Sequence, residues 1–199
     1  VQKGEHRRFL QQIDTATLQG KRDYAIMLIF LTTGVRVSVV ANSYIRDIEQ
    51  RGSEWVLAYT QKGGEGDAAR ITAIMPIILG YLEMRGVSLD NRNRPLFVAT
   101  ARGRRVMEHT GHETDIEQPL TDVSINNLVR KYARKAGLDG ITAHSLRHTA
   151  AMHAAQKGTI VEVSKLLRHK SIRVTTIYLE HLDIDGADRL TNELAEDLL

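Results

Sequence analysis

With 199 residues and an ordinary apolar fraction, the chain is long enough to bury a core without covalent staples, as one large domain or one domain with a small appendage. It contains no cysteine, which excludes disulfides, cysteine-bound zinc and a thiol nucleophile. The formal net charge of +3 is mildly basic, so a nucleic-acid partner is permitted but not required.

Helical patterns dominate the first part of the chain. A short amphipathic segment over residues 7–10 precedes an apolar run over 21–32, which predicts a buried helix. Gly34 follows this run and is typical of a helix C-terminus. A second helix is expected from Val37 toward Tyr44.

The pattern changes at Glu54. Residues 54–59 are short, aromatic and apolar, which predicts a strand, and residues 70–74 predict its return after a glycine-rich turn over 62–67. These segments indicate a hairpin or a three-stranded sheet. Pro76 then opens another helix, because proline suits the first helical turn.

Residues 86–119 are polar and irregular, apart from an apolar patch over 96–98, and predict a mobile loop over 99–118. Thr121 or Asp122 can then cap a helix running to about residue 136, with an apolar stripe on one face. Thr142 caps the next helix, which is expected to run to Lys157.

Three further helices are predicted toward the C-terminus. Thr159 and Glu162 form a capping box for a helix that reaches about Arg168. Ser171 caps a helix that carries Tyr178, and a final helix holds leucines at 190, 194, 198 and 199. The sequence therefore predicts a mainly α domain with a small antiparallel β-sheet, an α+β fold.

Charge is unevenly distributed along the chain. The final segment is acidic, which makes it a poor surface for DNA and a better one for protein contacts. Basic residues cluster earlier, at Arg102, Arg104, Arg105, Arg130, Lys131, Arg134, Lys135, Arg147, Lys165, Arg168, Lys170 and Arg173.

The sequence also suggests where the protein works. Its longest apolar run, residues 25–31, is too short to cross a bilayer, and no signal segment precedes it. We therefore expect a cytoplasmic protein with no membrane partner. Because the chain begins at Val1 and not at Met, we also expect an upstream domain in a longer protein.

The helix after Thr142 carries the first chemical signal. His144 and Arg147 are three positions apart, so they are expected to share one helical face near the N-terminus. Backbone N–H groups and the helix dipole attract an anion there, and an arginine adds a planar fork matched to phosphate oxygens. A solvated histidine and arginine at a helix start remain the simpler interpretation of this pair alone.

Combined with later motifs, the pair becomes specific. His144-Ser-Leu-Arg147-His148, then Leu166-Leu167-Arg168-His169, then Thr175-Thr176-Ile177-Tyr178 together resemble the C-terminal signature of tyrosine recombinases, the phage-type integrases. Thr33-Gly34-Val35-Arg36 resembles the segment holding the first catalytic arginine of that family. Gln61-Lys62-Gly63-Gly64 resembles the loop with its catalytic lysine.

The resemblance implies a fold and a role for each matched position. It implies the tyrosine recombinase catalytic-domain fold over residues 1–182, followed by a C-terminal tail helix over 183–199. The leucines of that helix either pack within the same chain or dock on a neighbouring protomer, as a terminal helix commonly does in the family. It implies that Tyr178 attacks the scissile phosphate of double-stranded DNA and forms a 3′-phosphotyrosyl bond. The remaining roles are phosphate clamping by Arg36 and Arg147, protonation of the 5′-hydroxyl by Lys62, proton transfer assisted by His144 and a phosphate hydrogen bond from His169.

Elementary chemistry is consistent with these residue types. A phosphodiester transition state gathers charge on its equatorial oxygens, so fixed cationic donors stabilise it more than the ground state. A free tyrosine has a pKa of about 10 and needs a base or nearby cations to become a nucleophile. Covalent attachment conserves the bond energy, so no cofactor is expected, and two arginine clamps stabilise the charge without a metal. The resemblance further implies a homotetramer on DNA and no small-molecule substrate.

Three positions depart from the family pattern. Val39 replaces the acidic residue usually found three places after the first arginine, and Arg168 replaces the usual glycine before His169. An arginine there would add a cation for DNA and strain a tight turn. The lysine hairpin contains two acids, Glu65 and Asp67, and lacks the basic residue that often follows the lysine.

Other functions stay open at this point. His109 and His112, flanked by Glu108 and Glu113, have a spacing that can hold zinc, but a solvated loop is the favoured interpretation. DNA relaxation in the manner of a type IB topoisomerase would use the same chemistry with one protomer. The loss of acid at Val39 would suit a DNA-binding module weakened in catalysis.

Overall fold

The structure is a computed structural model that describes residues 4–61, 63–99, 106–107, 113–114, 117–168, 173 and 176. The chain begins with helices α1 (Glu5–Leu10), α2 (Leu18–Thr33) and α3 (Val37–Ala41). Helix α2 starts three residues earlier than predicted, because the Thr17 side chain accepts a hydrogen bond from the Gly20 N–H at 3.0 Å. Helix α3 ends at Ala41, short of the predicted Tyr44.

A three-stranded antiparallel sheet follows the short 3₁₀ helix η1 (Ile45–Asp47). Its strands are β1 (Ile48–Arg51), β2 (Glu54–Thr60) and β3 (Gly66–Arg70), in the order β1-β2-β3. Leu57 and Ala69 pair across the middle of β2 and β3, and both are fully buried. The predicted sheet is confirmed, with three strands.

The position predicted for the last strand was wrong. The strand runs over Gly66–Arg70, whereas residues 72–74 form the 3₁₀ helix η2. Thr60 pairs with Gly66 and Tyr59 with Asp67, so the reversal between the strands is short. Gly63 and Gly64 have φ values of 120° and 87°, which other residues rarely adopt. Glycines therefore make this tight reversal possible.

Helix α4 (Met75–Arg85) has proline in its first turn, as predicted, and ends at Gly86 with φ 75°. The prediction of an irregular loop over 99–118 was incomplete. Within it, β4 (Val106–Met107) and β5 (Glu113–Thr114) form an antiparallel pair. Period-two patterns cannot reveal strands of two residues, because they contain no full repeat.

The three helices predicted next are confirmed. They are α5 (Asp122–Lys135), α6 (Ala143–Ala155) and α7 (Ile160–Leu167), and their caps are Thr121, Thr142 and Thr159. Each threonine accepts a hydrogen bond from the backbone N–H three residues later. Of the helix predicted to carry Tyr178, the structure describes Arg173 and Thr176, which are helical; Tyr178 itself and the C-terminal leucines lie outside the described residues.

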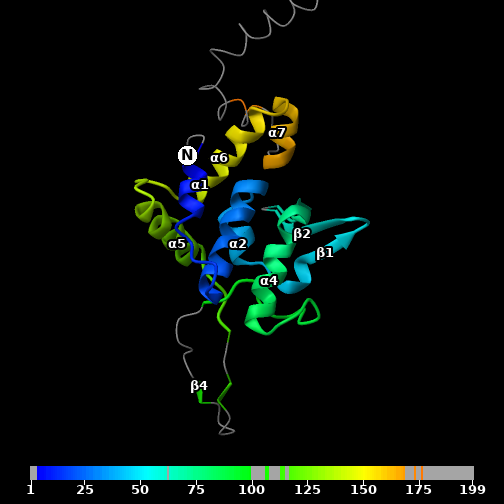
Figure 1. Cartoon of the computed structure of the whole chain (residues 1–199). Coiled ribbons are helices and arrows are strands. Elements are labelled where there is room, and N and C mark those ends of the chain that lie inside the picture. The colour runs from blue at the N-terminus through cyan, green and yellow to red at the C-terminus, as the bar shows by residue number, and fades with distance from the viewer. Residues whose placement is uncertain are drawn as a thin grey trace, which may run out of the picture.

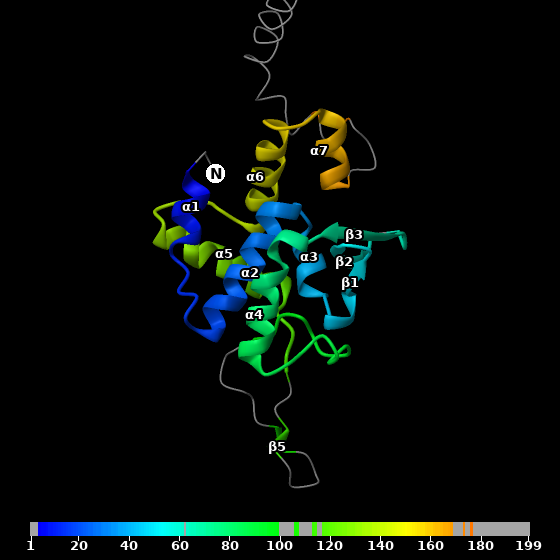
Figure 2. The same cartoon turned by 45° about the vertical axis from the view of Figure 1, so that its right-hand side comes forward.

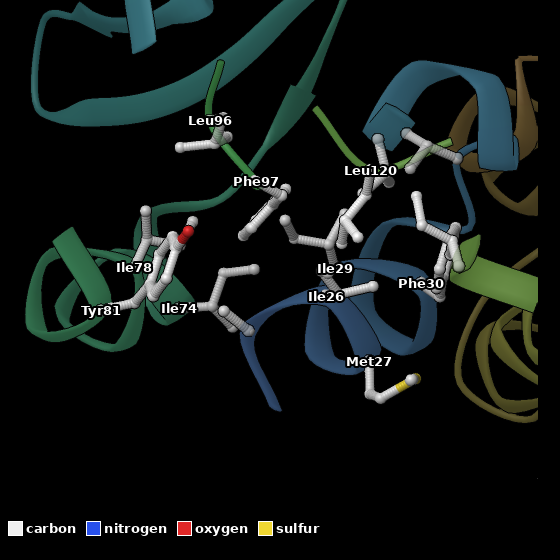
Figure 3. Packing of buried hydrophobic residues seen from close by; sticks show 14 of the residues in the cluster. Ile26, Met27, Ile29, Phe30, Ile74, Ile78, Tyr81, Leu96, Phe97 and Leu120 are labelled. Atoms are coloured by element: carbon white, nitrogen blue, oxygen red, sulfur yellow. The ribbon is translucent and has the colours of Figure 1, made fainter. Parts of the chain in front are cut away.

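Helix α2 lies in the middle of the molecule (Figures 1 and 2). Helices α1 and α5 lie on one side of it and the sheet on the other, while α6 and α7 lie at one end. Its side chains Ile26, Ile29 and Phe30 are fully buried and extend the core toward Phe97 (Figure 3). The rings of Phe97 and Tyr81 stack with centroids 5.7 Å apart, which joins α4 to this core.

An ion pair is buried within this core. Arg22 donates to the Asp23 carboxylate at 2.6 Å and to the Val98 carbonyl at 2.7 Å, and the Tyr132 hydroxyl donates to Asp23 at 2.8 Å. These bonds connect α2 with α5 and with the strand-like segment at Val98. Burial and the neighbouring Asp23 raise the pKa of Tyr132, which keeps its hydroxyl protonated as a donor.

Among the helices that the structure describes, none combines the length and the apolar character needed to cross a membrane.

Candidate active site

Arg147 lies in the second turn of α6, where three segments of the chain meet. Its side chain is almost entirely buried, with 6% exposure. One guanidinium nitrogen donates to the Leu167 carbonyl at 2.7 Å, and another donates to the Gly34 carbonyl. Both of these acceptors are neutral carbonyls, one at the end of α7 and the other just after α2. Arg147 therefore holds together two segments that are far from each other in sequence.

Glycine is favoured at position 34 for two reasons. It ends α2 with φ 60°, and its N–H donates to the Phe30 carbonyl at 3.0 Å. A Cβ atom at this position would lie 2.9 Å from the Leu167 side chain. Glycine therefore lets the end of α2 approach α7 closely, and this approach brings the Gly34 carbonyl within reach of Arg147.

Arg36 follows two residues after Gly34 and is the N-cap of α3. The buried Val35 fixes the backbone between them, with 2% exposure, while the Arg36 side chain is exposed. The structure thus places the two predicted phosphate-clamping arginines on segments joined by a direct hydrogen bond. One is buried at the base of the junction, and the other lies at its surface.

His144 lies in the first turn of α6 and is exposed. Both residues lie on α6 with the predicted spacing of three, but they differ in exposure, because Arg147 is buried and His144 is exposed. Sequence spacing sets the angular relation of two side chains on a helix, but the packing of α6 against α2 and α7 decides their burial. The Thr142 cap, which accepts from the Ser145 N–H at 3.3 Å, begins the helix that carries both residues.

The other predicted site residues, Lys62, His169 and Tyr178, lie outside the described residues. Their neighbours are described for two of them. Gln61 and Gly63 flank position 62 at the turn between β2 and β3, where the Gln61 N–H donates to the Glu65 carbonyl at 2.8 Å. Arg168, the C-cap of α7, precedes position 169.

Arg168 donates hydrogen bonds to other parts of the protein, and the expectation that it adds a cation for DNA stays a prediction. Its Nε donates to Asp67 at 3.0 Å and one terminal nitrogen to the Leu166 carbonyl at 2.6 Å, while the other donates to the Ala68 carbonyl. The expected tight turn is present, because Arg168 has φ 53° and ψ 47°. Two departures from the family pattern, Arg168 and Asp67, therefore pair with each other.

Sequence reasoning missed the polar cluster around Asp67. The carboxylate also accepts hydrogen bonds from Gln61 at 2.6 Å and from the Tyr59 hydroxyl at 3.2 Å. Burial opposes ionisation of Asp67, but the Ala68 N–H, Arg168 and Gln61 outweigh it and lower its pKa. Burial raises the pKa of Tyr59 to about 12, so the phenol is neutral and serves as a donor. The sequence offered one signal for this cluster: Arg168 and Asp67 both depart from the family pattern and carry opposite charges.

The described residues include no group of three histidine or acidic side chains that could hold a metal ion. His109 and His112, whose spacing suggested zinc, lie outside the described residues. Val39, where the family has an acid, is half-buried and packs against the core.

The fold is that of a tyrosine recombinase catalytic domain. The crystal structure of XerA recombinase superimposes with a TM-score of 0.72 at 24% identity, covering 97% of this chain and 62% of that one. XerH recombinase bound to palindromic difH substrate, in a post-cleavage complex, gives a TM-score of 0.72 at 20% identity, covering 96% and 52% of the two chains. Because both identities are 24% or less, this structural similarity establishes the fold alone.

Sequence comparison establishes the family. The sequence model of the phage integrase family matches residues 1–184, so the chain belongs to this family of tyrosine recombinases. Tyrosine recombinase XerA of Pyrococcus horikoshii is 31% identical over 159 residues, covering 79% of this chain and 50% of the relative. Tyrosine recombinase XerS of Streptococcus agalactiae is 29% identical over 163 residues, covering 79% and 41%. The chain thus spans half or less of the length of these two relatives.

Proposed function

We propose that the chain is the catalytic part of a site-specific recombinase that breaks and rejoins double-stranded DNA through a covalent bond to Tyr178. The observation that carries the proposal is the position of Arg147. It is bonded to the segment that leads to Arg36 and to the residue two places before His169. Family membership supports the same function, as does the likeness in fold to the XerH recombinase, whose crystal structure is of a complex with palindromic difH substrate.

In the proposed reaction, the Tyr178 oxygen attacks the scissile phosphorus, and the bond from phosphorus to the 5′-oxygen breaks. The phenol loses its proton with help from His144, and Lys62 supplies a proton to the departing 5′-hydroxyl. Rejoining reverses these steps, since a 5′-hydroxyl attacks the phosphotyrosine and releases the phenol. The number of phosphoester bonds is conserved, so the reaction requires neither ATP nor a cofactor.

The side chains of the described site suit a phosphate that arrives from solvent. Exposed Arg36 and His144 are accessible to DNA, whereas buried Arg147 is held by backbone carbonyls in a fixed orientation. A fixed donor stabilises the transition state without paying to reorganise at the moment of reaction. His169 completes the proposed contacts with a hydrogen bond to the phosphate.

The larger assembly belongs to the same proposal. Residues 1–182 form the catalytic domain, and the acidic segment 183–199 docks on a neighbouring protomer in a tetramer on DNA. The protein acts in the cytoplasm at the nucleoid. Exposed Arg130, Lys131, Arg134 and Lys135 on α5 add positive charge, so binding should weaken steeply with salt as counterions are released.

A suicide substrate tests the chemistry. DNA duplexes selected by the full chain from a random pool are nicked near the cleavage position, so that cleavage releases a short fragment and traps the covalent complex. Wild type should give an adduct on a denaturing gel, and Tyr178→Phe, which removes only the nucleophilic oxygen, should give none while still binding. Binding by both proteins with no adduct from either would indicate a non-catalytic DNA-binding module.

A second arm separates recombination from relaxation. A recombinase should exchange strands between two duplexes that carry the selected site. The rate of exchange should keep rising as the protein concentration increases beyond one protomer per site. Relaxation of supercoiled plasmid by single protomers, without exchange between sites, would indicate a topoisomerase.

A further inference from the structure

The end of α7 carries an arginine in a conformation that favours glycine. Of the residues the structure describes, Arg168 is the one non-glycine with positive φ, at 53°. Glycine would adopt this conformation at no steric cost. A side chain that persists in a strained backbone position indicates that its contacts over-determine the position.

The contacts of Arg168 reach across the molecule to the β2–β3 hairpin. All three guanidinium nitrogens are donors, to the Asp67 carboxylate, the Ala68 carbonyl and the Leu166 carbonyl. The side chains of Arg168 and Asp67 are 18% and 20% exposed, so water screens their attraction only in part. The planar guanidinium also lies near the Tyr59 ring, with its carbon 5.9 Å from the ring centroid.

Asp67 connects Arg168 to the turn of the hairpin, because it is hydrogen-bonded to residues on both sides. Its carboxylate accepts from Gln61, the residue immediately before Lys62, at 2.6 Å. Gln61 is itself held within the turn, because its carbonyl accepts from the Gly64 N–H at 3.0 Å. A continuous set of hydrogen bonds therefore joins the residue before Lys62 to the residue before His169.

We propose that Arg168 and Asp67 form a latch that positions the lysine-bearing hairpin against the end of α7. Arg168 and Asp67 act on the hairpin through Gln61, so all three are positioning residues and none of them touches the DNA. This inference rests on the proposed function, in which Lys62 protonates the leaving 5′-oxygen. Without the latch, DNA would still bind and Tyr178 would still attack, but the proton would arrive less often.

A sulfur substitution isolates that step. When sulfur replaces the bridging 5′-oxygen, the leaving thiolate needs little protonation, because a thiol has a pKa far below that of an alcohol. Single-turnover cleavage by the full chain is measured on the oxygen and sulfur versions of one suicide duplex. Arg168→Gly and Asp67→Asn should each cleave the oxygen substrate about 10- to 100-fold more slowly than wild type, and the sulfur substrate within about threefold of it.

Three control variants define the comparison. Arg70→Ala removes another arginine of the hairpin, one that is exposed and lies 3.4 Å from Glu54, and should cleave both substrates like wild type. Arg168→Lys keeps the charge without the fork and should fall between wild type and Arg168→Gly. Lys62→Ala should show the largest oxygen-specific loss. Thermal unfolding of each variant establishes that it is folded at the assay temperature.

Each failure has its own pattern. Arg168→Gly and Asp67→Asn could slow cleavage of the oxygen and sulfur substrates equally while Lys62→Ala cleaves the sulfur substrate at the wild-type rate. That result would overturn the latch and leave the proposed function standing. No adduct from wild type on either substrate would overturn the proposed function itself. If Arg168→Gly does not fold, the same comparison with Asp67→Asn decides, because its side chain keeps the shape of aspartate.

Discussion

Two buried arginines of this protein have different surroundings. Arg22, with 2% exposure, is paired with the fully buried Asp23 inside the core. Arg147, with 6% exposure, donates to the carbonyls of Gly34 and Leu167 at the meeting point of α2, α6 and α7. The same residue type therefore serves stability in one place and, by our proposal, catalysis in the other. Both arginines join distant segments, but Arg22 does so within a buried ion pair, whereas Arg147 is hydrogen-bonded to the segment that leads to exposed Arg36.

The largest effect should come from breaking the core pair. Arg22→Met leaves the Asp23 carboxylate buried without its cation, which should lower the free energy of unfolding by about 3–5 kcal/mol. Urea denaturation measures this change. The double variant Arg22→Met/Asp23→Leu should recover only part of the loss, because it removes both charges but also the partners of the Tyr132 hydroxyl and the Val98 carbonyl.

The matched control is Arg51→Met, since Arg51 also pairs with a carboxylate, Glu49, but is 55% exposed. Its stability should change by less than about 0.5 kcal/mol. A similar loss in both variants would show that burial of the Arg22 pair adds nothing, and the comparison with Arg147 would lose its basis.

A smaller loss of stability should follow from Tyr132→Phe. This change removes the 2.8 Å hydrogen bond to Asp23, which should cost about 1.5–3 kcal/mol because the acceptor is a buried charge. Covalent adduct formation by the folded variant should match wild type, as expected for a structural network. Tyr24→Phe, at the edge of the core, should change stability by less than about 0.5 kcal/mol. A loss of cleavage without a loss of stability in Tyr132→Phe would place the network in the active site.

Local signals in the sequence predicted most of the helices. Thr121, Thr142 and Thr159 cap helices as predicted, because a threonine side chain satisfies a nearby N–H whatever the distant chain does. The β3 strand was misplaced because its register depends on cross-strand partners such as Tyr59 and Asp67. Strand pairing of this kind is a tertiary property that a pattern within one segment does not encode.

The candidate site divides in the same way. The motifs predicted Arg36, His144 and Arg147 as site residues. The burial of Arg147 could not be predicted in this way, because it depends on how α6 packs. The pair of Arg168 and Asp67 was missed because its members are 101 positions apart in sequence. Each was noticed as unusual, and only the folded chain shows that the two unusual residues meet.

The central claim is that Arg36 and Arg147 act on one phosphate. A neutral methylphosphonate at the scissile position of the suicide duplex tests it, because the charge that both arginines would stabilise is removed. On the phosphate substrate, Arg36→Ala and Arg147→Ala should each slow single-turnover cleavage by about 100- to 1,000-fold while weakening DNA binding only modestly. The loss of each variant is its rate of cleavage relative to wild type on the same substrate. On the methylphosphonate, the loss of each variant should be at least about tenfold smaller than its loss on the phosphate. Losses of equal size on the two substrates for either arginine would contradict the claim.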